Sequence, residues 1–132
     1  MNSKVTCSQL WKKWEKEDPN DLRVIETRKR IDSYKKSDWE EMIADATLVI
    51  DKLKHLVVNN IDLNSIESIQ SSKHLEEHLN KYFFDVDVEY LLTMKNLLKI
   101  DQNYINFFNG FQDGLANRLI DMLDLRIKEM IL

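Results

Sequence analysis

The chain has 132 residues, a length typical of one domain with one hydrophobic core. Hydrophobic residues make up 43% and charged residues 32%, as in soluble globular proteins. Two glycines and one proline leave few positions for tight turns or helix breaks, which favours long helices over a β-sandwich or barrel. The net charge of −4 arises in the second half of the chain, which argues against direct nucleic-acid binding by this chain.

Cysteine usage and hydropathy bear on the compartment. Cys7 is the only cysteine, so an intrachain disulfide is impossible. No apolar run of the signal-peptide kind follows Met1, and no apolar stretch approaches the ~20 residues that span a bilayer. We therefore expect a cytoplasmic protein without a membrane segment, monomeric as an isolated domain. The basic tracts 28–30 and 35–36 are interpreted as a solvated helix face.

The first predicted helix covers about residues 8–17 and ends at Asp18, because a residue before proline disfavours helix. Its apolar positions fall on one stripe, formed by Leu10, Trp11 and Trp14. One hypothesis is that this helix docks only when an apolar partner completes its contact surface. The alternative is that both tryptophans are ordinary core residues.

The second predicted helix covers about residues 20–32. Only Leu22 and Ile25 are apolar at helical spacing, and most of the remaining positions are charged. A helix with so little surface to bury is expected to be marginal when isolated.

The third predicted helix has the clearest start signal in the chain. Ser37 and Glu40 have the spacing of a capping box, with Ser37 as the N-cap. Apolar residues then recur at helical spacing and predict a core-facing stripe that ends near Asn59. This stripe consists of Trp39, Met42, Ile43, Ala46, Ile50, Leu53 and Val57.

The remaining sequence predicts more helices separated by short polar breaks. They are expected at 65–84, at 88–100, in a short aromatic stretch after Asp101 that ends at Gly110, and from about Asp113 onward. The last helix carries a regular apolar stripe of Leu115, Leu119, Met122, Leu123, Ile127 and Met130. The predicted fold class is all-α.

Two groups of polar residues invite a chemical interpretation. His74 and His78 are four residues apart, a spacing that can chelate a metal when further ligands converge, but local hydrogen bonding is the favoured interpretation. Asp85, Asp87 and Glu89 lie where a helix begins, so capping is favoured over acid–base chemistry. No catalytic triad or phosphate-binding glycine loop is present. We therefore expect no catalytic residue, no metal site, no cofactor and no enzymatic activity.

Three blocks of sequence resemble the TipAS-type antibiotic-recognition domain. Tyr34 to Trp39, preceded by the basic tract 28–30, resembles the family pattern R…Y-x-x-x-D-W. The segment 78–89 is similar to H-I-x-x-W/Y-F/H-Y-x-C-x-x-E. The segment 98–104 resembles Y-x-x-D-x-R-F, and 114–116 matches G-L-A. These blocks keep their order and nearly their spacing over about residues 10–125.

This resemblance implies a globin-like, all-α domain that binds bulky, largely apolar antibiotics such as thiopeptides. The family occurs as the sensor half of MerR-type transcription activators and as free-standing drug-binding proteins. It implies a mobile N-terminal helical lid, placed here at residues 1–36, over a ligand-binding core at 37–132. The residues expected to line the cleft are Trp11, Trp14, Trp39, His78, Tyr82, Phe83, Val86 and Tyr90.

Two departures from the family pattern shape the expectation. The thiopeptide-binding prototype has a cysteine near the position of Val86 that captures the drug covalently, and valine has no nucleophile. Non-covalent binding is therefore expected, with Cys7 an ordinary thiol. No DNA-binding helix-turn-helix precedes Ser8. The chain is thus expected to act in drug sequestration and resistance, or as the sensor half of a regulator.

Two other functions remain open from the sequence. A globin-like helical fold with His78 is compatible with a haem or other small-cofactor protein. A helical protein–protein adaptor would use the tryptophan-bearing first helix as its docking face. Either would replace antibiotic binding as the function of the same aromatic residues.

Overall fold

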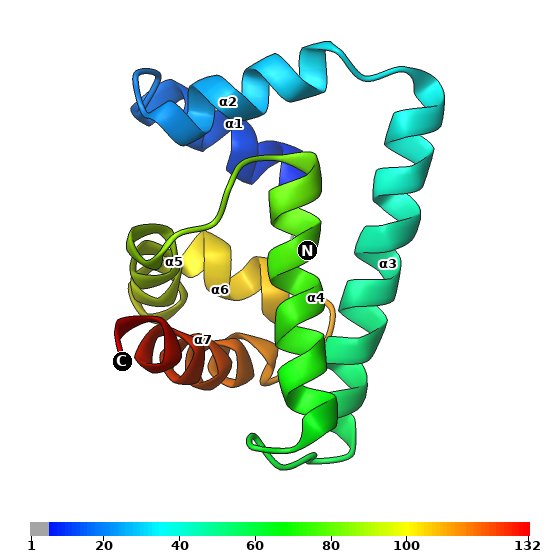
Figure 1. Cartoon of the computed structure of the whole chain (residues 1–132), viewed down its shortest axis with the longest axis vertical. Coiled ribbons are helices and arrows are strands. Elements are labelled where there is room, and N and C mark those ends of the chain that lie inside the picture. Colours follow the sequence, from blue (N-terminus) through cyan, green and yellow to red (C-terminus); the bar gives the residue numbers. More distant parts are fainter. Residues whose placement is uncertain (1–5) are drawn as a thin grey trace.

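The computed structural model describes residues 6–132, which fold into seven helices joined by short connections (Figure 1). The prediction of an all-α fold is confirmed. The helices are α1 (Cys7–Glu17), α2 (Leu22–Asp32), α3 (Lys36–Val58), α4 (Ile66–Tyr82), α5 (Val88–Ile100), α6 (Gln102–Asn109) and α7 (Leu115–Ile131). Within these residues, no helix is long and apolar enough to cross a membrane.

The core lies where α5 and α7 pack together, with α6 and the C-terminal half of α3 closing it. α3 and α4 form a long antiparallel pair on one side, and α4 also contacts α7 (Figure 1). The stripe predicted for the last helix is confirmed, because five of its six residues are buried and Met130 packs against them. Fully buried leucines from α3, α5 and α7 form the centre: Leu53, Leu56, Leu98, Leu115 and Leu119.

Side-chain caps fix where several helices begin. Ser65 accepts a hydrogen bond from the backbone N–H of Ser68 at the start of α4. Asp87 does the same for α5 and Asp101 for α6, each satisfying N–H groups that have no partner inside the helix. The capping role predicted for the acidic run at 85–89 is therefore confirmed at Asp87.

The start predicted for the third helix is wrong by two residues. α3 begins at Lys36 with Lys35 as its N-cap, so Ser37 already lies inside the helix. The reason is Asp38, whose Oδ2 accepts a hydrogen bond from the Lys35 N–H at 2.9 Å. This bond gives a partner to a backbone donor that the start of the helix would otherwise leave free.

The core-facing stripe predicted for this helix is only half correct. Leu53 is buried, and Ile50 and Val57 pack against the core, but Trp39 is 37% and Ile43 59% exposed. The cause is the position of α3, which meets α7 only toward its C-terminal end and extends beyond the core at its N-terminal end (Figure 1).

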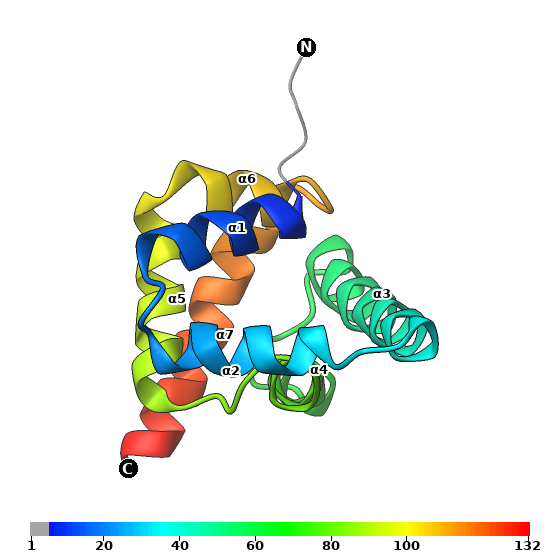
Figure 2. The same cartoon turned by 90° about the horizontal axis from the view of Figure 1, so that it is seen from above.

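The anchors predicted for the second helix are also wrong. Leu22 is 80% and Ile25 50% exposed, whereas Val24 and Thr27 are buried. α2 therefore turns a different face inward, toward the C-terminal end of α4. α1 has no buried residue and packs against α6. Both helices lie at the end of the molecule to which α3 extends (Figures 1 and 2).

Candidate functional site

An aromatic cluster joins α1 to the start of α5. Trp14 lies edge-on to Phe84, with ring centroids 5.7 Å apart, and 6.4 Å from the ring of Tyr90. Phe84 and Tyr90 are themselves 4.7 Å apart, and Trp11 contacts Trp14 at 6.1 Å. Phe84 is buried, while the other three rings are half-buried. This cluster brings Trp11, Trp14 and Tyr90 together, as the predicted cleft requires.

Two phenols and a thiol come close together beside this cluster. Burial raises the pKa of Tyr90 well above its usual range, and the charge of a Tyr104 phenolate would raise it further. Burial, together with the charge of Asp101, raises the pKa of Tyr104 to about 12. Cys7 is an exposed residue whose side chain lies near both phenols, and partial desolvation of its sulfur raises the pKa of the thiol. All three groups therefore stay protonated near neutral pH, and the thiol is a weak nucleophile.

Side chains from α2 and the turn after it cap the C-terminal end of α4. Thr27 Oγ1 donates to the carbonyl of Phe83 at 3.3 Å, and the Tyr34 hydroxyl donates to the carbonyl of Tyr82. Arg30 Nη1 donates to the carbonyl of Asn80 at 2.5 Å. Because the last carbonyls of a helix have no partner inside it, these three donors satisfy groups that α4 cannot satisfy alone.

Ion pairs fasten the same two N-terminal helices to the rest. Arg23 Nη2 is 2.8 Å from Asp87 Oδ1, and hydrogen bonds from Arg23 and the Tyr90 backbone lower the pKa of Asp87. Lys13 pairs with Asp101 at 3.6 Å. These contacts are partly exposed, so each contributes little on its own.

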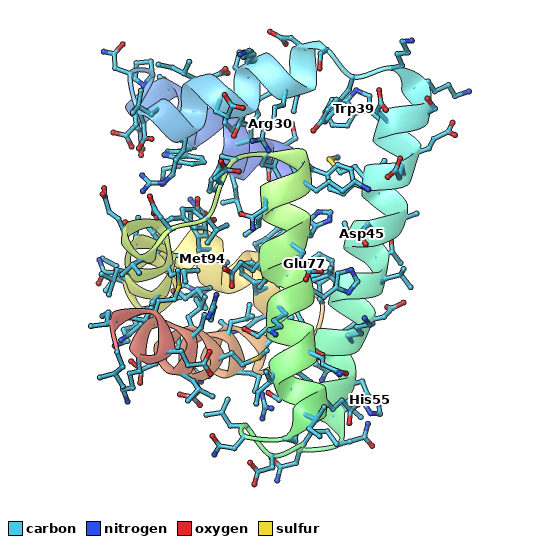
Figure 3. The ribbon with its side chains drawn as sticks, viewed as in Figure 1. Arg30, Trp39, Asp45, His55, Glu77 and Met94 are labelled. Carbon is cyan, nitrogen blue, oxygen red and sulfur yellow. The ribbon has the colours of Figure 1, made fainter. Side chains whose placement is uncertain are left out.

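The basic tract 28–30 is not simply a solvated face. Arg28 Nε donates to Glu15 Oε2 at 2.7 Å and so links α2 to α1. Arg30 pairs with Glu26 and reaches Asp85 at 3.5 Å, and of the three basic residues only Lys29 is exposed. Figure 3 shows Arg30 at the end of the molecule where α1 and α2 lie. Arg28 thus links the two N-terminal helices to each other, and Arg30 links α2 to the end of α4 and the connection after it.

Asp45 joins α3 to α4 through two histidines. His78 Nδ1 is 2.6 Å from Asp45 Oδ2, and His74 Nε2 is 2.8 Å from Asp45 Oδ1. Lys52 Nζ lies 2.9 Å from His74 Nδ1. Burial acts to raise the pKa of Asp45, but the two imidazole hydrogen bonds lower it below its usual value. Figure 3 shows Asp45 on the side of α3 that faces α4. Local hydrogen bonding, the favoured interpretation of the two histidines, is confirmed.

A second polar contact joins α3 to α4 one turn nearer the N-terminal helices. Glu41 Oε1 accepts from the Tyr82 hydroxyl at 3.0 Å and from Lys81 Nζ at 2.7 Å. The ring of Tyr82 lies 5.0 Å from that of His78, and Phe83 lies 5.9 Å from His78 on another side. His78, Tyr82 and Phe83 therefore form one group at the C-terminal end of α4.

The predicted site residues thus occupy four places rather than one. Trp11, Trp14 and Tyr90 pack with Phe84, and the group around His78 lies at the end of α4. Trp39 pairs with Tyr34 instead, with ring centroids 5.5 Å apart, near the turn between α2 and α3 (Figure 3). Val86 lies in the α4–α5 connection, where its N–H donates to the Asn80 side chain at 2.6 Å.

The site predicted from the sequence omits several residues that the structure brings to these places. Phe84 is the most buried ring of the aromatic cluster, and its position in an unbroken aromatic run was the available signal. Asp45 and Glu41 follow helical spacing on one face of α3, where acidic residues interrupt an otherwise apolar pattern. Tyr104 and Arg30 lie within family-like stretches of the sequence, but nothing in the sequence showed what either side chain would contact.

Two surface hollows lie away from these residues. A polar groove of about 320 Å³ between α3 and α4 is lined by Asp51, Lys52, His55, Glu67, Gln70 and Ser71. His55 marks this groove in Figure 3, at the opposite end of the molecule from α1 and α2. A second, much smaller hollow lies between α4 and α7. None of the predicted site residues lines either hollow.

These observations describe an all-helical domain in which two N-terminal helices bring aromatic and basic side chains against the junction of α4 and α5. Residues 8–125 match the sequence model of one protein family, the TipAS antibiotic-recognition domain. The match covers nearly the whole chain, and the chain belongs to this family of antibiotic-recognition domains. The resemblance found in the three sequence blocks is confirmed. None of the curated proteins and none of the solved structures compared with the chain matches it.

Proposed function

We propose that this domain binds a bulky, largely apolar antibiotic of thiopeptide-like character between its N-terminal helices and the rest of the fold. The family match supports antibiotic recognition, and the aromatic cluster around Trp14 is the observation that supports this location. Bound drug would be sequestered, which confers resistance, or would be sensed by a MerR-type regulator of which this chain is the sensor half.

The uncovered half of α3 supports this location. Its apolar stripe continues from Leu53 and Ile50 in the core to Ile43, which is largely exposed, and Trp39, which is about one-third exposed. Seen from the end that carries α1 and α2, α1 and α3 lie on different sides of the molecule (Figure 2). An apolar ligand that contacts both surfaces would gain ~25 cal/mol for each Å² of apolar area removed from water, before the entropy of ordering is subtracted.

The lid is proposed to comprise residues 1–36 and the ligand-binding core residues 37–132, with residues 1–5 outside the described part of the chain. α1 has no buried residue, so opening it exposes little core. Closure over a ligand would bury indole surface that is half-exposed in this structure. The proposed ligand contacts are Trp11, Trp14, Trp39, His78, Tyr82, Phe83, Val86 and Tyr90.

Titration of an antibiotic panel, followed by intrinsic tryptophan fluorescence, tests the proposal. Two of the three tryptophans lie on α1 and the third lies at the uncovered end of α3, so a bound drug should change their emission. Saturable changes with at least one thiopeptide are expected, and a charged hydrophilic antibiotic such as an aminoglycoside is the control. A flat response to every apolar antibiotic, with no change in melting temperature, would contradict the proposal.

Binding is proposed to be non-covalent. Val86 cannot attack a dehydroalanine, and the raised pKa of the Cys7 thiol keeps it from acting as a ready nucleophile. Intact-mass spectrometry after incubation with a dehydroalanine-containing thiopeptide should show unmodified protein. An adduct that disappears in Cys7→Ser would identify Cys7 as the nucleophile and overturn this part of the proposal.

A further inference from the structure

Four polar side-chain tips at the junction of α1, α5 and α6 have no protein partner. The indole N–H groups of Trp11 and Trp14 and the hydroxyls of Tyr90 and Tyr104 make no hydrogen bond to another residue within 6–132. They are not sealed from solvent either, because the only fully buried, unpartnered side-chain atoms in that range belong to Arg23 and Arg118. Since polar atoms in a crowded aromatic setting usually find a partner, these four groups are available to one from outside.

Each of these four side-chain tips can donate a hydrogen bond. An indole N–H is a donor only, and a phenol hydroxyl donates readily to a carbonyl or an azole nitrogen. The rings are close enough to act on one ligand, with Trp14 centred 6.4 Å from Tyr90 and 6.1 Å from Trp11. Tyr104 joins them from α6, which packs against both α1 and α5. The surrounding surface therefore offers apolar area together with hydrogen-bond donors.

The phenols keep their protons under physiological conditions. Burial is the main cause of the raised pKa of both Tyr90 and Tyr104, and the charge of Asp101 raises the pKa of Tyr104 further. A phenolate would accept hydrogen bonds and repel an anion, whereas a neutral phenol can donate. The two hydroxyls can therefore each donate a hydrogen bond to an uncharged acceptor.

We propose that the Tyr90 and Tyr104 hydroxyls select ligands that carry an uncharged hydrogen-bond acceptor, a tertiary amide carbonyl or azole nitrogen, on an aromatic body. This deepens the proposed function and rests on it, since it assigns the chemical feature that the lid–core junction recognises. Burial of apolar area favours the binding of any apolar molecule, while the two hydroxyls discriminate between molecules with and without a hydrogen-bond acceptor. A ligand of equal shape without an acceptor would cover both hydroxyls without giving either a hydrogen-bond partner.

Two matched fragments test this assignment without any antibiotic. N,N-dimethylbenzamide carries an acceptor and no donor, and the hydrocarbon 3-methyl-2-phenyl-1-butene, with C=CH2 in place of C=O and CH in place of N, has nearly the same shape with neither. Their affinities for the full chain are measured from the indole N–H signals of the tryptophans by NMR. The ratio of amide to hydrocarbon affinity should fall about three- to tenfold in Tyr90→Phe and in Tyr104→Phe. Tyr34→Phe is the control, because its hydroxyl bonds to the Tyr82 carbonyl outside this cluster.

A ratio that is unchanged in both cluster variants, or wild-type protein whose indole signals respond to neither fragment, would overturn the assignment. A measurement on wild type alone guards against variants that fold poorly. Because Cys7 lies beside both phenols, saturating amide should slow its alkylation by iodoacetamide, and an unchanged rate would also count against the assignment. An antibiotic that binds while the ratio stays constant refutes only this inference. A ratio that shifts while no antibiotic binds refutes only the proposed function.

Discussion

α1 and α2 have the same length but are attached to the molecule by different means. α1 has a complete capping box between Thr6 and Gln9 and a clear apolar stripe, yet it buries no residue. α2 has a weaker apolar pattern, yet Val24 and Thr27 are buried and its side chains bond to carbonyls at the end of α4. How well a helix is capped and patterned, and how firmly it is attached to the rest of the fold, are therefore separate properties.

This difference divides the proposed lid into two unequal parts. α1 is held by ring contacts of Trp14 and by partly exposed ion pairs, which are easily lost and regained. α2 is held by directional hydrogen bonds to backbone groups that would otherwise lack a partner. We expect α1 to open first and α2 to follow only under stronger perturbation.

The largest effect is expected at Trp14. Trp14→Ala should weaken binding of a thiopeptide that binds wild type by about 1–3 kcal/mol, because the indole is the link between α1 and the Phe84–Tyr90 pair. Stability should change less than affinity, since the ring is only half-buried in the free protein. Paired titration and melting curves provide both numbers. A variant that binds like wild type but melts far lower would show that α1 is ordinary core.

The second prediction concerns the attachment of α2. Arg30→Leu should lower the free energy of unfolding by about 1–2 kcal/mol, because it leaves the Asn80 carbonyl without its donor. Lys29→Leu is the matched control on the same helix, where replacing an exposed side chain should change stability by less than about 0.5 kcal/mol. Urea unfolding of both variants measures the difference. Equal stabilities would remove the distinction between α1 and α2.

The third prediction asks whether polar anchoring also holds α3 to α4. Asp45→Asn should lower stability by about 1 kcal/mol at neutral pH, because the carboxylate bonds to both His74 and His78. The pKa of Asp45 is lower in the folded state than its ordinary 3.8, so its contribution is present above that pH and is lost as pH falls through the folded value. The gap between wild type and variant should therefore begin to narrow below about pH 3.8 and close once the pH is below the lowered pKa of the folded state. A gap that persists there would contradict the assigned role.

The smallest effect is expected at Trp39. The sequence pattern placed this residue at the start of a core stripe, which predicts a loss of ~3 kcal/mol or more for Trp39→Ala. In the structure it is 37% exposed and contacts Tyr34, so we expect a loss of about 1 kcal/mol or less, together with weaker ligand binding. Thermal melts with and without ligand measure both. A loss of 3 kcal/mol in the free protein would restore the original interpretation.

Periodicity predicted the helices well because apolar spacing and caps are local properties. Val88–Ile100 was predicted to the residue, and Asp87 caps it as expected. Contacts between helices were harder to predict from the sequence, because they depend on which residues meet in space. Thr27 and Arg30 carry no sequence signal that they cap α4, and Asp45 gives no hint that two histidines will reach it.

The site shows the same limit. Aromatic richness and the family pattern led to Trp14 and Tyr90, which do pack together through Phe84. The same reasoning placed Trp39 with them, although it pairs with Tyr34 at the end of α3. Helical periodicity indicates which face is apolar but not how far along the helix a neighbour continues, so it could not separate Leu53 in the core from Trp39 beyond it.

Hydrogen exchange with and without a bound thiopeptide tests the central claim most directly. In the free protein, amides of α1 should exchange fastest, those of α2 more slowly and those of α5 and α7 slowest, because burial and anchoring increase in that order. Ligand should protect α1 most and leave α7 nearly unchanged. Equal protection of α1 and α5 in the free protein, unaltered by a ligand that binds, would contradict the proposal that the N-terminal helices form a lid.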